Sequence, residues 1–214
     1  MDRASTVRPL RDQAELHETL SLVLQRADPD TAGFTYRLVG TAAALAHGVP
    51  LPAGDVDILV AQRSDVDTFA AALAEFPCLT SPTWIADARQ YFASFHVGPI
   101  VVEFSTVERP ADTDTFECVG SGPWRHFVHI AVGTHLVPVV SLELRLVSEL
   151  VRDRPDRYGP LIDHIRQHGG DLDLVHRSMH DRGVDPMLRQ RIMKRVGSDI
   201  YRLDRDHDGY GYDD

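Results

Sequence analysis

Apolar residues recur along this chain with two different periods, and the change of period divides the sequence. Up to about residue 140, short apolar runs typical of β-strands alternate with stretches in which apolar residues recur every three or four positions. From residue 141 onward only the helical period remains. Strands with interleaved helices, followed by helices alone, predict an α/β (α+β) core that carries a helical C-terminal part.

The predicted elements follow from these periods and from the residues that interrupt them. We expect strands at residues 34–39, 55–61, 79–86, 90–96, 100–106, 127–131 and 136–140. We expect helices at residues 12–27, 42–47, 64–75, 141–152, 158–168, 171–182 and 186–196. Ser64 is the expected N-cap of its helix. Pro155 is expected to end the helix that precedes it and so to separate two helices. The predicted organisation is a core at 1–140, a helical part at 141–203 and an acidic flexible tail at 204–214.

Charge is distributed unevenly over these parts. The chain of 214 residues has a net charge of −10, which argues against DNA as a partner. Residues 145–203 hold 12 Lys and Arg against 9 Asp and Glu, a net of +3. The helical part could therefore offer cations to an anionic substrate, although an ordinary solvated helical surface explains the same count. The chain has one lysine, Lys194, so any cationic role is expected to fall to arginine.

The remaining composition favours a cytoplasmic protein. The first thirty residues are polar and charged, and no apolar run approaches the ~20 residues of a membrane span. Cys78 and Cys118 lack the spacing of metal ligands and are expected to stay reduced.

Asp55 and Asp57 form the most informative pattern in the sequence. Residues two apart on a strand share a face, whereas the apolar Val56, Ile58 and Val60 point to the other face, toward a core. Two carboxylates on one face repel each other unless a cation lies between them. Mg²⁺ favours oxygen ligands and often shares them with a phosphate, so the pair is a candidate magnesium site.

A third acidic ligand is expected on a neighbouring strand, because two-metal sites need more than two carboxylates. Glu103 is the only charged residue in the apolar run 100–105 and is our candidate. A charge among apolar neighbours is costly unless it is paired or bound to a metal. The alternatives are a position at the solvent edge of the strand or an ion pair with an arginine.

Gly40 and Thr41 lie where a strand meets a helix. A glycine there lets the backbone approach a phosphate, and the hydroxyl of Thr41 adds a donor. Gly-Thr alone also fits an ordinary helix N-terminus, but the Asp-x-Asp pattern fifteen residues later makes a phosphate role more specific.

With these motifs, residues 38–60 resemble the nucleotidyltransferases of the DNA polymerase beta superfamily. That family has an apolar strand, Gly-Gly/Ser/Thr, a short helix, Asp-x-Asp/Glu on the next strand and a third acid on a later strand. The sequence of these motifs is most similar to the small bacterial branch of antibiotic nucleotidyltransferases and AbiEii-like toxin enzymes. The resemblance covers mainly residues 34–105 and continues weakly in residues 139–143 and 152–157.

The resemblance implies a mixed sheet flanked by helices and a Mg²⁺-dependent transfer of a nucleoside monophosphate from an NTP to an acceptor hydroxyl. Asp55, Asp57 and Glu103 would bind the metal, and Glu103 would also deprotonate the acceptor. Gly40 and Thr41 would hold the triphosphate. The acceptor could be a small molecule, a protein or a tRNA.

Two departures from the family pattern leave a second hypothesis open. Many relatives carry Arg-x-Thr before the first Asp, where this chain has Leu51-Pro52-Ala53-Gly54. The usual helical lysine is also missing, and Arg145 is the nearest candidate for its role. The alternative is therefore a weak or inactive binding module of the same fold, either regulatory or antitoxin-like, with a toxin–antitoxin partner protein.

Three further patterns offer weaker predictions. The tail 204–214 begins like an EF-hand loop but ends before the final ligand position, so we expect a solvated tail. His47 could face the site, although a histidine that binds carbonyl oxygens at a helix end is the simpler reading. His164 and His168 share a helix face but lack a third ligand at fixed spacing.

Overall fold

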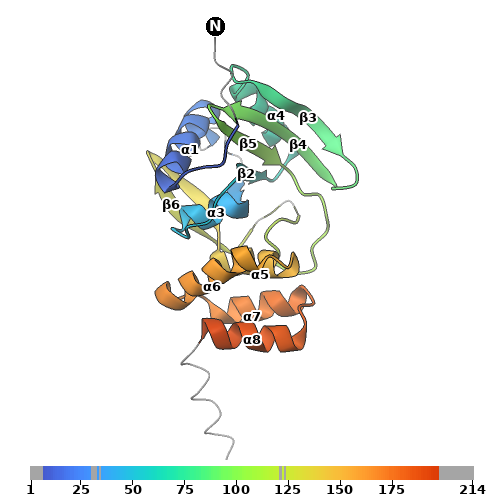
Figure 1. Cartoon of the computed structure of the whole chain (residues 1–214). Helices are drawn as coiled ribbons and strands as arrows, with labels where there is room; N and C mark the ends of the chain where they lie inside the picture. The colour runs from blue at the N-terminus through green and yellow to red at the C-terminus, as the bar shows by residue number, and fades with distance from the viewer. Residues whose placement is uncertain (1–6, 30–32, 34, 121, 123, 198–214) are drawn as a thin grey trace, which may run out of the picture.

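A seven-stranded mixed sheet with helices on one face and at one end makes up the fold (Figure 1). The computed structural model describes residues 7–29, 33, 35–120, 122 and 124–197. The strands are β1 Tyr36–Val39, β2 Asp55–Val60, β3 Cys78–Ile85, β4 Gln90–Val97, β5 Ile100–Ser105, β6 Phe127–Val132 and β7 His135–Val140. The helices are α1 Gln13–Ala27, α3 Gly40–Ala46, α4 Arg63–Ala72, α5 Leu142–Val151, α6 Pro155–His168, α7 Leu172–Asp181 and α8 Pro186–Val196. The mixed sheet, the flanking helices and the helical C-terminal segment confirm the predicted fold class.

The strand order is β3-β4-β5-β2-β1-β7-β6. Strand β2 lies between β1, to which it is antiparallel, and β5, to which it is parallel. Strands β4 and β5 form an antiparallel pair, and so do β6 and β7. The strand with the two aspartates is therefore central in the sheet, with the strand of Glu103 beside it.

Most element ends agree with the sequence pattern, and the exceptions have local causes. The side chain of Asp12 accepts the backbone N–H of Glu15 at 2.9 Å and fixes the start of α1. Helix α4 begins at Arg63, one residue before the expected N-cap, Ser64. Gln62 is the N-cap in its place, and its backbone N–H donates to the side chain of Asp65. Helix α6 begins at Pro155 itself, since proline suits the first turn, where its missing N–H costs nothing.

Pro82 lies inside β3 and does not end the strand. Strand β3 is at the edge of the sheet, where a residue without an N–H is tolerated. Its pairing with β4 shifts register between Thr80 and Thr83, around the proline. The strand therefore changes its register around Pro82 without ending there.

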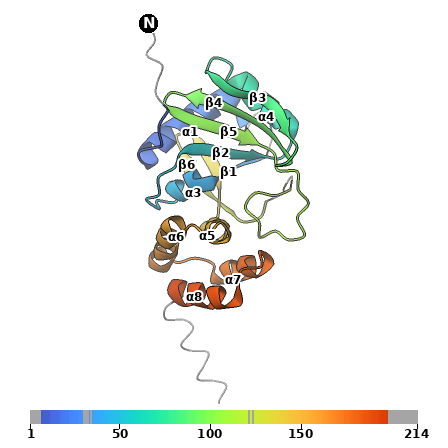
Figure 2. The same ribbon diagram turned by 45° about the vertical axis from the view of Figure 1, so that its right-hand side comes forward.

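Helices α1 and α4 lie on one face of the sheet, and α5 to α8 stack below it (Figures 1 and 2). The short helix α3 lies between the sheet and α5, so it joins the two layers (Figure 2). No helix in the described part of the chain is long and apolar enough to cross a membrane.

Two hydrophobic clusters meet at α3. The larger includes Val56, Ile58 and Val60 of β2 with the apolar faces of α1 and α4. The smaller joins the helices α5 to α8, and Ala44 of α3 belongs to it, whereas Ala43 belongs to the larger cluster. Packing on both sides therefore fixes α3, and with it the end of β1 that faces the aspartates.

Candidate active site

Three carboxylates converge on the face of the sheet opposite α1 and α4. In the parallel pair β2–β5, Asp57 lies directly beside Glu103, so both side chains point to the same face. Asp55 is two residues earlier on β2 and shares that face. One carboxylate oxygen from each residue lies within 4.8 Å of the others. The structure thus brings together the three acids that the sequence pattern selected.

This donor set fits a divalent cation. Within the described residues, Asp55, Asp57 and Glu103 are the one group of three or more His, Cys, Asp or Glu side chains that could hold an ion. All ligands are carboxylate oxygens, which Mg²⁺ prefers at a distance of about 2.1 Å. The three side chains are half-buried, so one side of such an ion would remain open to a phosphate or water.

Burial and mutual repulsion raise the pKa values of two of these acids. Burial, together with the charges of Asp55 and Glu103, raises the pKa of Asp57 to about 8. Burial and the charge of Asp55 also raise the pKa of Glu103, against a hydrogen bond with Asp57. Without a cation, Asp57 is therefore largely protonated at neutral pH, and a bound cation would replace that proton.

Gly40 is required by its close contact with Asp57. A Cβ atom on Gly40 would lie 2.0 Å from Oδ2 of Asp57, far inside van der Waals contact. The backbone at Gly40 also has a φ of 69°, a conformation that residues with a side chain rarely adopt. Gly40 and Thr41, expected as a turn, are the first residues of α3 and form a sharp corner against Asp57.

A buried acid, Glu117, holds this corner from inside. Its Oε1 accepts the backbone N–H of Gly40 at 2.9 Å and a hydrogen bond from Nη1 of Arg145 at 2.8 Å. Burial opposes ionisation of Glu117, but the guanidinium of Arg145 outweighs it and lowers the pKa of the carboxyl. Arg145 also pairs with Glu149 one helical turn later on α5. The corner therefore rests on a buried network of charged groups.

This network gives Gly40 and Arg145 contacts that the sequence did not indicate. The N–H of Gly40, expected to face a phosphate, donates to Glu117. Arg145, the candidate for the triphosphate, is 2% exposed and engaged with Glu117 and Glu149. In this structure Arg145 acts on the site through Glu117, by positioning the corner.

Sequence reasoning missed Glu117. It lies in the segment between β5 and β6, which has no helical or strand period, and its partners are 77 and 28 residues away. The only local signal is an acid between Phe116 and Cys118, which the sequence offers no reason to prefer over other loop acids.

Two of the four residues just before Asp55 are packed in the core, whereas Pro52 and Gly54 are exposed. Leu51 is 5% exposed and Ala53 is fully buried. The carbonyl oxygen of Ala53 accepts the N–H of Leu10 at 2.8 Å. The residues that replace the upstream arginine of the family pattern therefore contribute packing and no charge.

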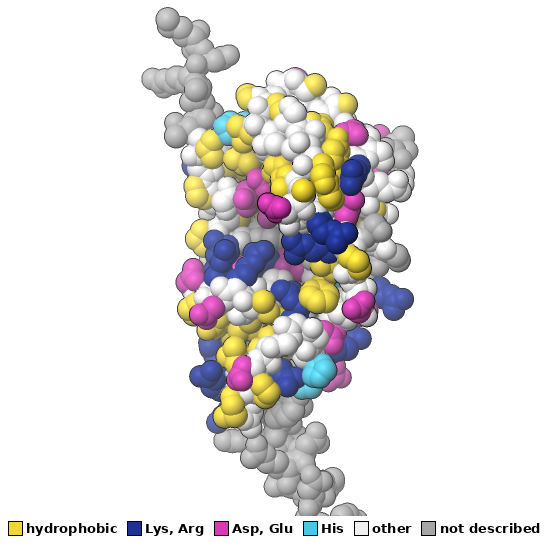
Figure 3. Space-filling model, turned by 90° about the vertical axis from the view of Figure 1, so that its right-hand side faces the viewer, with side chains coloured by type: hydrophobic (Ala, Val, Ile, Leu, Met, Phe, Trp, Pro, Cys, Tyr) yellow, Lys and Arg dark blue, Asp and Glu magenta, His cyan; other side chains and the backbone are white. Residues whose placement is uncertain are grey.

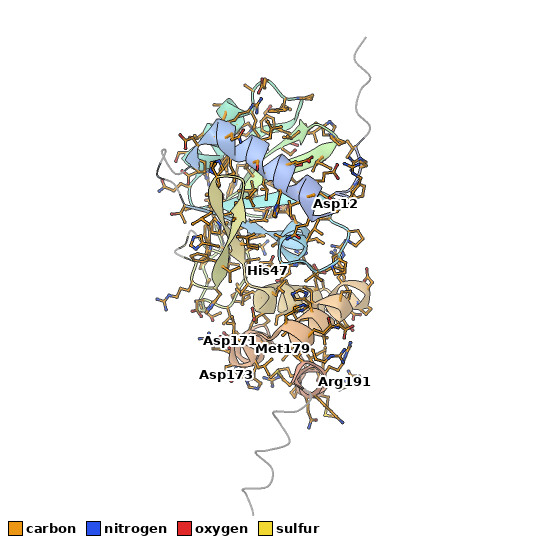
Figure 4. The ribbon with its side chains drawn as sticks, turned by 90° about the vertical axis from the view of Figure 1, so that its left-hand side faces the viewer. Asp12, His47, Asp171, Asp173, Met179 and Arg191 are labelled. Carbon is orange, nitrogen blue, oxygen red and sulfur yellow. The ribbon has the colours of Figure 1, made fainter. Side chains whose placement is uncertain are left out.

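The other sequence candidates have structural contacts. His47 ends α3, where its Nε2 lies 2.9 Å from the carbonyl oxygen of Val140, and it lies between the sheet and the lower helices (Figure 4). The rings of His164 and His168 stack 4.1 Å apart without a third metal ligand among the described residues. Cys78 and Cys118 are both free thiols. The EF-hand-like tail 204–214 lies outside the described residues.

The comparison with solved structures gives three neighbours, among others. A candidate nucleotidyltransferase from Thermotoga maritima, TM1012, is 16% identical at a TM-score of 0.50, over 73% of this chain and 96% of that one. An antigenic nucleotidyltransferase-like protein from Paracoccidioides brasiliensis is 13% identical at a TM-score of 0.47, over 87% and 94%. The antibiotic-resistance factor ANT(2'')-Ia is 12% identical at a TM-score of 0.43, over 92% and 100%.

At this identity the first of these likenesses shows the fold, and the other two carry no further argument. No protein-family model matches the chain, and no curated protein matches its sequence. None of the three structures is named as an AbiEii-like enzyme, so that branch of the resemblance stays a prediction.

The contact of Gly40 with Asp57 generates the first prediction. Gly40→Ala should lower the melting temperature by about 2 to 4 °C per kcal/mol lost, with a loss of about 1 to 3 kcal/mol from strain and steric conflict. Gly159→Ala on α6 is the matched control, because nothing lies within 4 Å of its added Cβ. Helix propensity should make that control neutral or slightly stabilising. Equal melting temperatures for the two variants would contradict the contact.

The raised pKa of Asp57 generates a prediction about pH. The folded state keeps a proton up to about pH 8, whereas an unfolded aspartate loses it near pH 4. The metal-free protein should therefore lose stability as pH rises from about 4 to 8. Asp57→Asn should remove this dependence. With a chelator present, the melting temperature of the variant should exceed that of wild type by a margin that grows to about pH 8. Parallel pH profiles would exclude the shift.

The buried position of Glu117 generates a third prediction. Glu117→Ala leaves the guanidinium of Arg145 short of a partner and the N–H of Gly40 without an acceptor, and should cost about 3 to 5 kcal/mol. The control is Glu108→Ala, which breaks the exposed pair with Arg63 and should cost about 1 kcal/mol or less. Urea denaturation of the three proteins measures both values. Similar losses for the two variants would show that the buried network does not stabilise the fold.

Proposed function

We propose that this chain, which has the nucleotidyltransferase fold, is a Mg²⁺-dependent nucleotidyltransferase. The observation that carries the proposal is the convergence of Asp55, Asp57 and Glu103 within 4.8 Å of one another. Three half-buried carboxylates so close together are unfavourable without a cation, and a purely structural role does not require them. We also propose that the protein is cytoplasmic, as expected from the sequence.

In the proposed reaction, a hydroxyl of the acceptor attacks the α-phosphorus of an NTP and pyrophosphate leaves. Asp55, Asp57 and Glu103 would hold Mg²⁺, and an ion bound there would neutralise charge on the phosphate oxygens and lower the pKa of the attacking hydroxyl. Glu103 accepts the proton of that hydroxyl as the general base. The corner at Gly40 contributes space, since no side chain there separates Asp57 from a phosphate.

The acceptor is a small molecule, a protein or a tRNA in this proposal. The acidic core, with a net charge of −9 over residues 1–144, mildly favours a small cationic acceptor over RNA. The carboxylates of the site contribute to this count, so acceptor classes have to be compared by experiment.

The test measures binding and transfer in turn. Calorimetry with Mg²⁺ and each NTP should show binding by wild type. An α-labelled NTP incubated with aminoglycosides, tRNA or protein should then transfer its label to one class. Asp57→Ala and Glu103→Ala should lower the transfer rate about a hundredfold or more. Asp173→Ala, which removes an exposed acid of α7 (Figure 4), should leave the rate unchanged.

Failure of wild type to bind any NTP with Mg²⁺ would refute the enzyme. NTP binding without transfer to any acceptor would favour the second hypothesis, a binding module of this fold that is regulatory or pairs with a toxin. Equal transfer by wild type and the two site variants would refute the roles of Asp57 and Glu103.

A further inference from the structure

An arginine of the helical part reaches the corner beside the three carboxylates. Arg157, in the first turn of α6, donates a hydrogen bond from Nη1 to Oγ1 of Thr41 at 2.9 Å. Thr41 is buried and follows Gly40, whose Cα lies against the carboxylate of Asp57. A cation 116 residues from Thr41 in sequence is therefore a close neighbour of the proposed metal site.

The charge of Arg157 is not neutralised by the protein around it. Within the described part of the chain, its contact is the neutral hydroxyl of Thr41, and no carboxylate lies within ion-pair distance. The side chain is half-buried, so the guanidinium has lost part of its hydration. Arg145, in contrast, pairs with both Glu117 and Glu149. Arg157 thus presents an unpaired, partly desolvated charge, which is a favourable partner for an anionic ligand.

Further arginines of the helical part add to its positive charge. Arg152 and Arg154, between α5 and α6, are exposed and each lies 3.8 Å from Glu149, the carboxylate that Arg145 already occupies. Arg182, just after α7, stacks over Phe116 at 4.9 Å without a carboxylate partner in the described structure. Burial and the like charge of Arg152 lower the pKa of Arg182, so these cations lie near each other. Figure 3 shows Lys and Arg side chains in a band across the middle of the molecule, below acidic side chains.

We infer that Arg157 binds the triphosphate of the NTP and supplies the cation that the chain lacks upstream of Asp55. This inference rests on the proposed function. A triphosphate whose α-phosphate lies at the carboxylates must extend its β- and γ-phosphates to a neighbouring surface. The segment 51–54 before Asp55 has no charged side chain, and its Leu51 and Ala53 are buried, so it offers no cation. The guanidinium of Arg157 offers several N–H donors in a plane, which suits the oxygens of two phosphates.

A purely structural role explains these observations less well. If Arg157 were only a structural pin, that is, a contact that holds α6 near α3, one hydrogen-bond donor to Thr41 would be enough. A neutral side chain would provide that donor without the cost of desolvating a charge. The two roles differ in what they predict for ligands with different numbers of phosphates. A phosphate-binding arginine affects ATP more than AMP, whereas a pin affects both alike.

The experiment compares four proteins in full-length form: wild type, Arg157→Ala, Arg157→Lys and Arg166→Ala. Arg166 lies on the same helix, is 48% exposed and, among the described residues, pairs with Asp163 at 3.4 Å, so its removal is the matched control. Calorimetry with Mg²⁺ measures the dissociation constants of ATP, ADP and AMP for each protein. Thermal unfolding without ligand measures the structural effect of each change.

We expect Arg157→Ala to weaken ATP binding about tenfold to a hundredfold, the usual loss for a charge-assisted hydrogen bond. AMP binding should change less than about threefold, and Arg157→Lys should recover part of the ATP affinity. The salt dependence of ATP binding should also decrease in Arg157→Ala, because one cation fewer contacts the phosphates. Arg166→Ala should match wild type in every measurement.

The outcomes separate this inference from the proposed function. If wild type binds ATP with Mg²⁺ and Arg157→Ala binds it equally well, the inference is wrong and the proposed function stands. Equal losses for ATP and AMP, together with a lower melting temperature, would show a structural pin and overturn the inference. If wild type binds neither ATP nor any other NTP with Mg²⁺, the proposed function and the inference both fail.

Discussion

Repulsion among three carboxylates is the constraint on which the site depends. The parallel register of β2 and β5 puts Asp57 beside Glu103, and the strand period adds Asp55 on the same face. None of the three side chains can move to the other face of the sheet without a change in the pairing of a central strand. Burial strengthens the repulsion, and the pKa of Asp57 rises to about 8 as a result. The site therefore stores an unfavourable interaction that a proton relieves partly and a divalent cation relieves more fully.

The surroundings of the carboxylates are arranged so that this unfavourable cluster persists. The absence of a side chain at Gly40 leaves room for the carboxylate of Asp57. Glu117 and Arg145 hold the backbone of Gly40 in place from the interior, while Arg157 contacts Thr41 from the other side. The two hydrophobic clusters meet at α3. The sheet and the lower helices thus act together on one corner, and the cations of the helices face the acids of the sheet.

Local sequence patterns were sufficient to predict the fold class and the three acids. Asp55 and Asp57 alternate with apolar residues, so their common face follows from the strand period. Glu103 stood out as the only charge in its strand, although its register with Asp57 depends on a strand pairing that the sequence does not display.

Contacts between distant segments could not be predicted in the same way. Glu117 lies in a segment without periodicity, and its value to the fold comes from Gly40 and Arg145, which are distant in sequence. Arg157 belongs to a charged run that resembles a solvated helix start, and only the tertiary placement of α6 brings it to Thr41. Arg145 was selected for its charge and its position on a helix, but burial beside Glu117 and Glu149 determines what it contacts.

Electron paramagnetic resonance of bound Mn²⁺ tests the central claim most directly. Mn²⁺ accepts the same oxygen ligands as Mg²⁺ and reports both its binding and its neighbours. The account predicts a bound Mn²⁺ in wild type whose affinity falls strongly in Glu103→Gln, with phosphorus couplings from added ATP. Mn²⁺ binding that is unchanged in that variant, or a bound ion without phosphorus couplings in the presence of ATP, would contradict it.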